Sequence, residues 1–469
     1  MSRGLTAKLA LARGVATLSR FSGSGATSLP GKVLMRLEPS AIGALGGRLS
    51  EGSVLVSATN GKTTTAAMAA GILTGEGHTL VHNRAGANMA GGIATTLLAA
   101  ARSGEGIDGE LGLFEVDELW LAQLARELQP RAILLGNLFR DQLDRYGELE
   151  AIADSWQHVL SSSNAAAVLN ADDPLIADLG RERPGTLYFG VEDDSLALAG
   201  IAHAADAKHC RNCGAPYIFD AVYLGHLGHY HCPNCGRERP VPEVTAENVR
   251  LEGVRAASFT LRTPAGSAEV QLALPGLYNI YNALAAAALA VTLEIPLAKI
   301  VEGLQETQPA FGRAESVAVS LDRSGARATP GATRELRIML VKNPAGANEV
   351  LRTLALEPGE HDLLGVLNDQ IADGRDVSWI WDADFELLAG RVGSVLCSGS
   401  RAADLAARFK YAGVEGSRIH IQEDLEGALA QAVLAGDSGR PLYALPTYTA
   451  MLALRELLVA RGEAGSAWT

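Results

Sequence analysis

The sequence predicts an α/β fold with more than one domain, and three observations support this prediction. A chain of 469 residues is too long for a single ordinary hydrophobic core. From Ser53 onward, short apolar runs alternate with stretches of helical pattern, as in parallel strands that helices cover on both faces. This alternation breaks between about residues 203 and 243, where Cys, His, Gly and Pro accumulate, and then resumes. We therefore expect an α/β domain with an insertion, followed by a second α/β unit.

The composition argues against two classes of function. Hydrophobic residues make up 48% of the chain and charged residues 20%, which is typical of a globular protein. The formal net charge of −13 argues against nucleic acid as a partner. No apolar run is long enough to span a membrane, and the N-terminus lacks the apolar core and cleavage site of a signal peptide. We expect a cytoplasmic protein.

Residues 1–48 are expected to form an N-terminal helix and a connector. Basic residues alternate with Leu, Ala and Val at roughly helical spacing, at Arg3, Lys8, Arg13 and Arg20. Such a helix either packs on the first domain or rests on the anionic inner face of a membrane. The segment 21–30 is rich in Gly and Ser, which indicates a connector.

A phosphate-binding loop is predicted at residues 57–65, between the apolar run 54–56 and the helical run 64–73. In a strand–turn–helix of this kind, backbone N–H groups and the helix N-terminus surround phosphate oxygens. Lys62 would reach the terminal phosphates of a nucleotide, and Thr63 would hold Mg²⁺. A strict P-loop has Gly where Val56 stands, so the prediction depends on the strand–turn–helix context. The candidate nucleotide-binding residues of this loop are Thr59, Asn60, Gly61, Lys62, Thr63 and Thr64.

Glu115 is the next candidate residue of the same site. It follows the apolar run 111–114, which is expected to be a neighbouring strand, and it opens an acidic stretch with Asp117 and Glu118. An acidic residue at the end of such a strand commonly binds the Mg²⁺ of a nucleotide. The alternative is a solvated acidic turn, but the nearby phosphate loop favours the Mg²⁺ ligand.

Two cysteine pairs predict a zinc site in the insertion. Cys210-x₂-Cys213 and Cys232-x₂-Cys235 are separated by 18 residues, and a Gly follows each pair. Two such knuckles close a tetrahedral Zn²⁺ site, and four thiolates leave no open position for catalysis. The neighbouring histidines are surplus ligands that we expect in turns or at the surface, namely His209, His226, His229 and His231. The fifth cysteine, Cys397, lies in an apolar run and is expected to be buried rather than nucleophilic.

The second unit is expected to follow a polar stretch at residues 323–334, which is a linker or a loop. Its most unusual segment is 367–382, where four aspartates, a Gly and two Trp follow an apolar run. This composition suits a site or an interface, and the alternative is a solvated acidic turn. The small-residue turn at residues 398–401 is either an anion site or a tight strand–helix connection.

Five segments resemble motifs of the Mur ligase family, in the family's order. They are 57–63 (S-A-T-N-G-K-T), 137–145 (N-L-F-R-D-Q-L-D-R), 169–173 (L-N-A-D-D), 275–283 (P-G-L-Y-N-I-Y-N-A) and 312–313 (G-R). The resemblance implies a Mur ligase-like central ATP-binding domain over residues 49–314 and a Rossmann-like α/β domain over residues 315–469. It also implies that Asn279 and Asn282 lie near the adenine and that Arg313 reaches the phosphates.

Three departures from the common family pattern, at Ala58, Gln142 and Lys342, resemble the MurT branch of the family. That branch also carries a Cys₄ ribbon in its central domain. The resemblance implies an ATP-dependent carbon–nitrogen ligase of peptidoglycan biosynthesis, which amidates the α-carboxyl of D-glutamate in lipid II to D-isoglutamine. The implied cofactors are ATP, Mg²⁺ and a structural Zn²⁺, and the change at Gln142 leaves open whether one or two Mg²⁺ ions bind.

The resemblance further implies a heterodimer with a GatD-like glutaminase subunit that docks on the C-terminal domain and supplies ammonia. An aspartate of this chain would complete the partner's catalytic triad; by motif position it is Asp376, with Asp369 and Asp373 as alternatives. The chain itself shows no convincing Cys–His glutaminase signature, which independently favours a partner. Two other functions stay open: a Mur or folylpolyglutamate-type ligase that adds an amino acid, and a zinc-ribbon adaptor with a vestigial nucleotide site.

Overall fold

The computed structural model describes most of the chain. The described residues are 8–16, 28–83, 87–102, 104, 106–141, 149–201, 205–308, 313–321, 333–435 and 439–465. Most of the predicted connector at 21–30 and of the polar stretch at 323–334 lies outside these ranges. Arg3, Arg20 and Gln142, which the sequence singled out, lie outside them as well.

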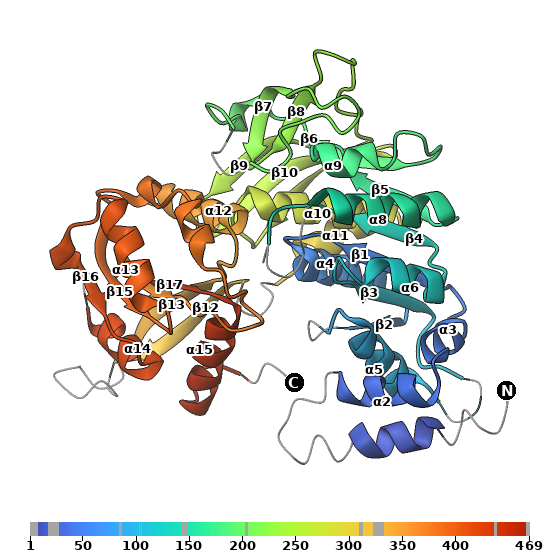
Figure 1. Cartoon of the computed structure of the whole chain (residues 1–469), viewed down its shortest axis with the longest axis horizontal. Coiled ribbons are helices and arrows are strands. Elements are labelled where there is room, and N and C mark those ends of the chain that lie inside the picture. The colour runs from blue at the N-terminus through green and yellow to red at the C-terminus, as the bar shows by residue number, and fades with distance from the viewer. Residues whose placement is uncertain are drawn as a thin grey trace.

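Two separate sheets, each covered by helices, confirm the predicted α/β architecture (Figure 1). The strands of the larger sheet, in spatial order, are β11 (Gly266–Leu272), β10 (Ala256–Thr263), β9 (Val244–Glu252), β6 (Leu187–Val191), β5 (Ala166–Asn170), β4 (Ala132–Leu135), β1 (Ser53–Ser57), β3 (Leu111–Glu115) and β2 (Leu80–His82). From β9 to β2 neighbouring strands are parallel, whereas β10 and β11 continue the sheet as antiparallel strands.

Helices cover both faces of the larger sheet, which explains why all five residues of β1 are buried. Residues of α4, α10 and α11 form the core on one face, and residues of α5, α6 and α8 form the core on the other. The helices of this part are α2 (Leu29–Leu37), α3 (Ala41–Gly46), α4 (Lys62–Glu76), α5 (Ala90–Ala100), α6 (Leu121–Leu128), α8 (Leu149–Ser162), α9 (Pro174–Asp178), α10 (Leu277–Thr292) and α11 (Leu297–Gln305), with the 3₁₀ turn η1 (Asp194–Leu196).

The smaller sheet begins with β12 at Arg313, before the polar stretch 323–334 that the second unit was expected to follow. Its strands, in spatial order, are β12 (Arg313–Ser320), β13 (Thr333–Met339), β17 (Leu442–Pro446), β14 (His361–Val366), β15 (Val392–Ser398) and β16 (Ile419–Ile421). Its helices are α12 (Pro344–Ala355), α13 (Ala402–Tyr411), α14 (Leu425–Leu434) and α15 (Tyr448–Ala460), with the 3₁₀ turns η3 (Ser378–Trp381), η4 (Phe385–Leu388) and η5 (Gly416–Arg418). The polar stretch 323–334 therefore falls between two antiparallel neighbours of one sheet and ends in the first residues of β13, so it does not separate the two units.

The insertion forms a hairpin between β6 and β9, at the top of Figure 1. Its strands β7 (Ile218–Leu224) and β8 (Leu227–His231) pair antiparallel and form a separate two-stranded sheet. The insertion thus adds an element beside the larger sheet without interrupting the order of its parallel strands.

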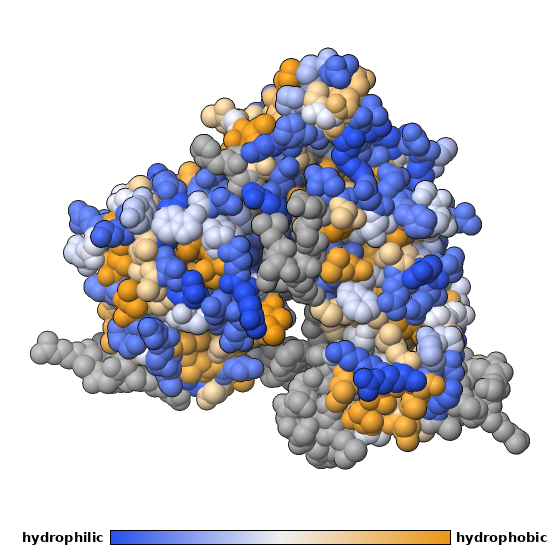
Figure 2. All heavy atoms as spheres, viewed as in Figure 1, coloured by the Kyte–Doolittle hydropathy of each residue, from blue (hydrophilic) through white to orange (hydrophobic). Residues whose placement is uncertain are grey.

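The helix at residues 8–16 packs on the central domain, as one of the two interpretations of the N-terminus predicted. Leu9 and Ala12 are buried in its core, and Lys8 Nζ lies 3.0 Å from a carboxylate oxygen of Glu38. Hydrophobic side chains gather on the outer face of this helix and of α2, where Leu11 and Leu29 are exposed (Figure 2). Within the described ranges, no helix is both long enough and apolar enough to cross a membrane.

Candidate functional site

The predicted phosphate loop lies at the carboxyl end of β1, where ligands commonly bind in parallel sheets. β1 ends at Ser57 and α4 begins at Lys62, two residues earlier than the predicted helix. Gly61 has φ +84°, and a Cβ atom there would lie 1.9 Å from Asn282 Oδ1, so the turn requires glycine. All six predicted residues of the loop line one cavity of about 350 Å³.

Lys62 is held at the base of this cavity by acidic groups. Its Nζ donates to Glu118 Oε2 at 2.9 Å and to the Ala58 carbonyl. Burial alone would lower the pKa of Lys62, but the carboxylates of Glu118, Glu115 and Asp117 raise it above its usual value. The ammonium is therefore charged at neutral pH and faces the site where the terminal phosphates of a nucleotide would lie.

Glu115 ends β3 directly beside β1, in register with Val56. The side chain of Asn83 fixes its backbone, because the Glu115 N–H donates to Asn83 Oδ1 at 2.9 Å and Asn83 Nδ2 donates to the Glu115 carbonyl at 2.8 Å. Glu115 and Thr63 line the same cavity. A carboxylate and a hydroxyl are oxygen ligands of the kind that Mg²⁺ prefers, so these two residues fit the predicted ion.

Two residues that follow β13 contact the phosphate loop or its neighbours from the C-terminal domain. Lys342 Nζ forms an ion pair with Asp141 and lies 3.4 Å from the Thr59 carbonyl oxygen. Asn343 and Asn60 exchange amide hydrogen bonds of 3.0 and 3.3 Å. The phosphate loop is thus in direct contact with both domains.

The residues predicted near the adenine lie at the start of α10. Asn282 lines the cavity, and Thr65 of α4 donates to its Oδ1 at 3.3 Å. Asn279 lies behind it, because its side chain donates to the Pro275 carbonyl at 2.8 Å and accepts from Asn282 Nδ2 at 3.1 Å. The side chain of Arg313 lies outside the described part of the chain.

The four paired cysteines come together as predicted. Their Sγ atoms all lie within 4.8 Å of one another, with 3.6 Å between Cys210 and Cys235 and 3.4 Å between Cys213 and Cys232. Tetrahedral Zn²⁺ with Zn–S bonds of about 2.3 Å needs sulfur atoms about 3.8 Å apart, so the cluster fits zinc. Gly214 and Gly236 both have positive φ and complete the two knuckles, which accounts for the glycine after each pair.

Cys232→Ser is expected to lower the zinc content from one ion per chain to a small fraction and to destabilise the hairpin, because zinc binding supplies folding energy in such knuckles. Zinc released on denaturation and the thermal unfolding curve measure the two effects. Cys397→Ala, outside the cluster, is the matched control and should keep a full complement of zinc. Full zinc in Cys232→Ser would contradict the four-thiolate site.

The aspartates of the acidic segment 367–382 differ from one another in burial and in hydrogen bonding. Asp373 is buried and accepts from the backbone N–H of Thr449 at 2.7 Å, and Asp369 accepts from the Ser400 hydroxyl at 2.7 Å. Asp376 is exposed, and its bonds with Ser378 lower the pKa of its carboxyl. The Asp376 carboxylate is therefore ionised and accessible at the surface, whereas the Asp373 carboxylate is buried and hydrogen-bonded within the domain.

The structure decides two further predictions about the C-terminal domain, which concern Cys397 and the turn that follows it. Cys397 is fully buried in β15, and burial raises the pKa of its thiol to about 12, so it is not a nucleophile. In the adjacent turn, the N–H groups of Gly399, Ser400 and Arg401 all donate to protein acceptors. The turn is a tight strand–helix connection, and the anion-site alternative is not supported.

Sequence reasoning missed the roles of several residues in or beside the cavity. Glu118 was only part of an acidic stretch, yet it holds Lys62. Asp141 and Lys342 were motif positions without a role, and they meet across 201 residues of sequence. The departure from the common family pattern at Lys342 was the one available signal for this contact.

Comparisons with known protein families and sequences identify similar proteins. The family model of the Mur ligase middle domain matches residues 56–290, and that of the MurT ligase C-terminal domain matches residues 340–451. The chain is 34% identical over 450 residues to the MurT subunit of lipid II isoglutaminyl synthase (glutamine-hydrolyzing) from Streptococcus pneumoniae, covering 95% of this chain and 94% of the relative. It is 30% identical to the corresponding subunit from Staphylococcus aureus strain N315, covering 95% and 96%.

Solved structures show the same fold at lower identity. A pseudomurein peptide ligase type C from Methanothermus fervidus has a TM-score of 0.66 at 24% identity, covering 89% of this chain and 80% of that chain. A MurF ligase from Thermotoga maritima in complex with ADP has a TM-score of 0.58 at 17% identity, covering 92% and 85%.

Two α/β domains with a phosphate-loop cavity between them define a protein of the Mur ligase class. Residues from both matched regions line the cavity, such as Lys62 in the first and Lys342 in the second. The chain belongs to the MurT branch of the Mur ligase family.

Proposed function

We propose that this chain is the synthase subunit of a lipid II isoglutaminyl synthase, with ATP as its nucleotide. The observation that carries the proposal is the cavity in which Lys62, Thr63 and Glu115 meet Lys342 of the C-terminal domain. The near full-length similarity to subunits of that name supports the substrate, the α-carboxyl of D-glutamate in lipid II.

ATP would bind with its phosphates over the N-terminus of α4 and its base toward Asn282. Lys62 and the loop N–H groups would bind the terminal phosphates, and Arg313 is proposed to reach them as well. Mg²⁺, held by Thr63 and Glu115, would neutralise phosphate charge and orient the terminal phosphate for in-line attack.

The proposed reaction has two steps. A carboxylate oxygen of the substrate attacks the γ-phosphorus, which forms an acyl phosphate and breaks the bond to ADP. Ammonia then attacks the acyl carbon, the new C–N bond forms as phosphate leaves, and the nitrogen loses a proton to give the amide. Lys62 stabilises negative charge that develops on the phosphoryl oxygens in the first step.

Ammonia is proposed to come from a GatD-like glutaminase subunit in a heterodimer. None of the five cysteines of this chain is suited to hydrolyse glutamine, because four form the zinc cluster and Cys397 is buried. Asp376, ionised and exposed on the C-terminal domain, is proposed to orient the partner's catalytic histidine. Lipid II would be met at the cytoplasmic face of the membrane.

The nearest competing function is a ligase that adds an amino acid to the same kind of carboxylate. Phosphate release by the purified chain, with lipid II as acceptor, should be supported by ammonium salt and not by amino acids. Mass spectrometry of the product should show conversion of one carboxyl to an amide. Incorporation of an amino acid would reject the amidation, and absence of nucleotide hydrolysis under all conditions would favour the adaptor with a vestigial site.

A further inference from the structure

The tip of the inserted hairpin reaches the nucleotide cavity. The cysteine knuckles lie at the ends of β7 and β8 away from the turn, since one pair precedes β7 and the other follows β8. At the turn, Leu224 and Leu227 line the cavity together with Thr59 and Lys62 of the phosphate-loop region. Both leucines are almost completely buried. The insertion therefore forms part of the cavity wall.

His226 lies in the turn between these two leucines, which is one of the two expected places of the surplus histidines, but it is fully buried rather than exposed. Its ring packs against Phe139 with 4.5 Å between centroids, and Nε2 lies 3.4 Å from Asp173 Oδ2. Gly225 lies close to the Phe139 ring, because a Cβ atom at residue 225 would lie only 2.8 Å from Phe139 Cε1. Of the four neighbouring histidines, His226 alone is buried.

Phe139 connects the hairpin tip to the phosphate loop. Its backbone N–H donates to Thr59 Oγ1 at 3.0 Å, and the Thr59 hydroxyl bonds to the Phe139 carbonyl at 3.2 Å. Asp173, which faces His226, also accepts from the Leu138 N–H at 2.8 Å. The tip thus packs against the segment whose backbone is hydrogen-bonded to Thr59.

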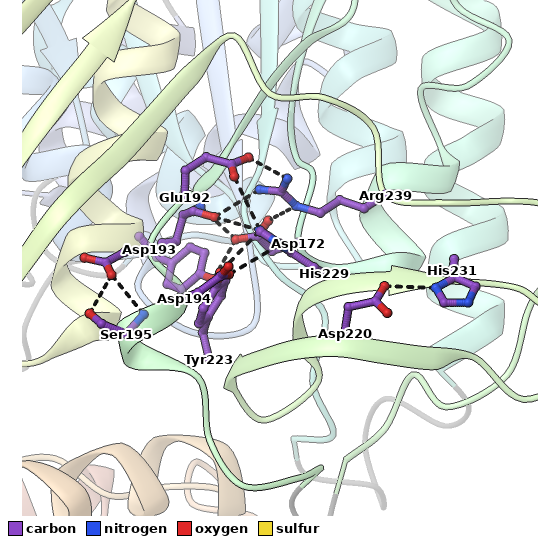
Figure 3. Close-up of polar contacts among 12 residues, drawn as sticks. Asp172, Glu192, Asp193, Asp194, Ser195, Asp220, Tyr223, His229, His231 and Arg239 are labelled. Atoms are coloured by element: carbon purple, nitrogen blue, oxygen red, sulfur yellow. Dashed lines mark hydrogen bonds and ion pairs between the residues drawn. The ribbon is translucent and has the colours of Figure 1, made fainter.

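A second connection runs through Asp172, which Figure 3 shows beside Arg239. Arg239, at the far end of the insertion, lies 2.6 Å from Asp172 Oδ1 and 2.7 Å from Glu192 Oε1. Tyr281 of α10, whose side chain lines the cavity, donates to Asp172 Oδ2 at 2.7 Å. The far end of the inserted segment is therefore connected through Asp172 to Tyr281, a residue that lines the cavity.

We propose that the hairpin tip, defined as residues 224–227, is a nucleotide-positioning element that holds Phe139 and the phosphate loop in their binding geometry. The inference rests on the proposed binding of ATP in this cavity. The Zn²⁺ cluster would set the base of the hairpin, and the side chains of the tip would act on the cavity.

The test measures the Kd of a fluorescent ATP analogue for the full chain, together with zinc content and melting temperature. His226→Ala and Leu227→Ala remove contacts at the tip, and both should raise the Kd about tenfold or more while zinc content stays at the wild-type level. Gly225→Ala keeps every side chain of the tip but displaces Phe139, and it should raise the Kd in the same direction. In turnover assays, the KM for ATP should rise more than kcat falls.

Asp220→Asn is the control on the same hairpin, because Asp220 is exposed, bonds to His231 (Figure 3) and does not line the cavity. It should leave the Kd unchanged. Zinc-loaded, folded Leu227→Ala and Gly225→Ala proteins with a wild-type Kd would overturn the inference and leave the tip as packing alone. A wild-type chain that does not bind the analogue would instead refute the proposed ATP site itself.

Discussion

Lys62→Ala is expected to lower ATP-dependent amidation by about a thousandfold. The Lys62 ammonium is the cation at the N-terminus of α4, and neighbouring carboxylates raise its pKa, so it is charged when phosphate charge must be stabilised. Losing one preorganised group of this kind costs a factor of about 10²–10³, and losing a cation on a transferred phosphoryl group costs up to about 10⁵. Phosphate release with ammonium and acceptor carboxylate present is the measurement.

The matched control for this variant is Lys299→Ala, because Lys299 also forms an ion pair with a glutamate, Glu302, but on the exposed surface of α11. Surface pairs of this kind contribute little to stability, so activity and melting temperature should stay close to wild type. Lys62→Ala leaves the buried Glu118 carboxyl without its ion-pair partner. Because burial already raises the pKa of that carboxyl, Glu118 can bind a proton instead of remaining a buried charge, and this limits the loss of stability. Wild-type turnover in Lys62→Ala would refute the proposed phosphate site.

Asp376→Asn is expected to reduce glutamine hydrolysis by the assembled heterodimer by about three to four orders of magnitude. An amide in place of a triad carboxylate neither orients the histidine correctly nor stabilises its cation, and this substitution lowers kcat by about 10⁴ in a serine protease. Asp376 is suited to the role because it is exposed and its pKa is lowered by Ser378. Ammonia release from glutamine measures the effect.

Amidation driven by ammonium salt separates a triad role from a general defect. Asp376→Asn should retain this activity in full, because Asp376 does not line the nucleotide cavity. Asp369→Asn is the neighbouring control, since Asp369 is occupied by the Ser400 hydroxyl and lies 3.8 Å from Arg401. If Asp376→Asn hydrolyses glutamine normally while Asp369→Asn does not, the two aspartates exchange roles; if both hydrolyse it normally, the shared triad is wrong.

The features that could be predicted from sequence have their signal within a few adjacent residues. Each cysteine knuckle can be recognised from two cysteines and the glycine that follows them. The phosphate loop can be recognised from a strand, a glycine at residue 61 and a helix. The strands around Val54 and Leu113 were visible because the middle residues of central parallel strands are apolar. Only their ends shifted by one or two residues, as helix and strand termini commonly do.

The features that could not be predicted are contacts between distant segments. Asn343 meets Asn60 across 283 residues, and a single sequence carries no periodicity that links them. His226 looked like a surplus zinc ligand because its neighbours in sequence are cysteines and histidines. Its neighbours in space are Phe139 and Asp173, and burial against them depends on how the hairpin docks.

By itself, the sequence determined the local chemistry of this protein: a phosphate loop, an acidic strand end, a four-thiolate cluster and two α/β units. These features depend on the type of a few residues and on their short spacing along the chain, and both are fixed before the chain folds. The tertiary structure decided which of these parts share one cavity, because the relative placement of the two sheets and of the hairpin depends on long-range packing. It placed Lys342 of one domain and the hairpin tip of the insertion at the same phosphate loop.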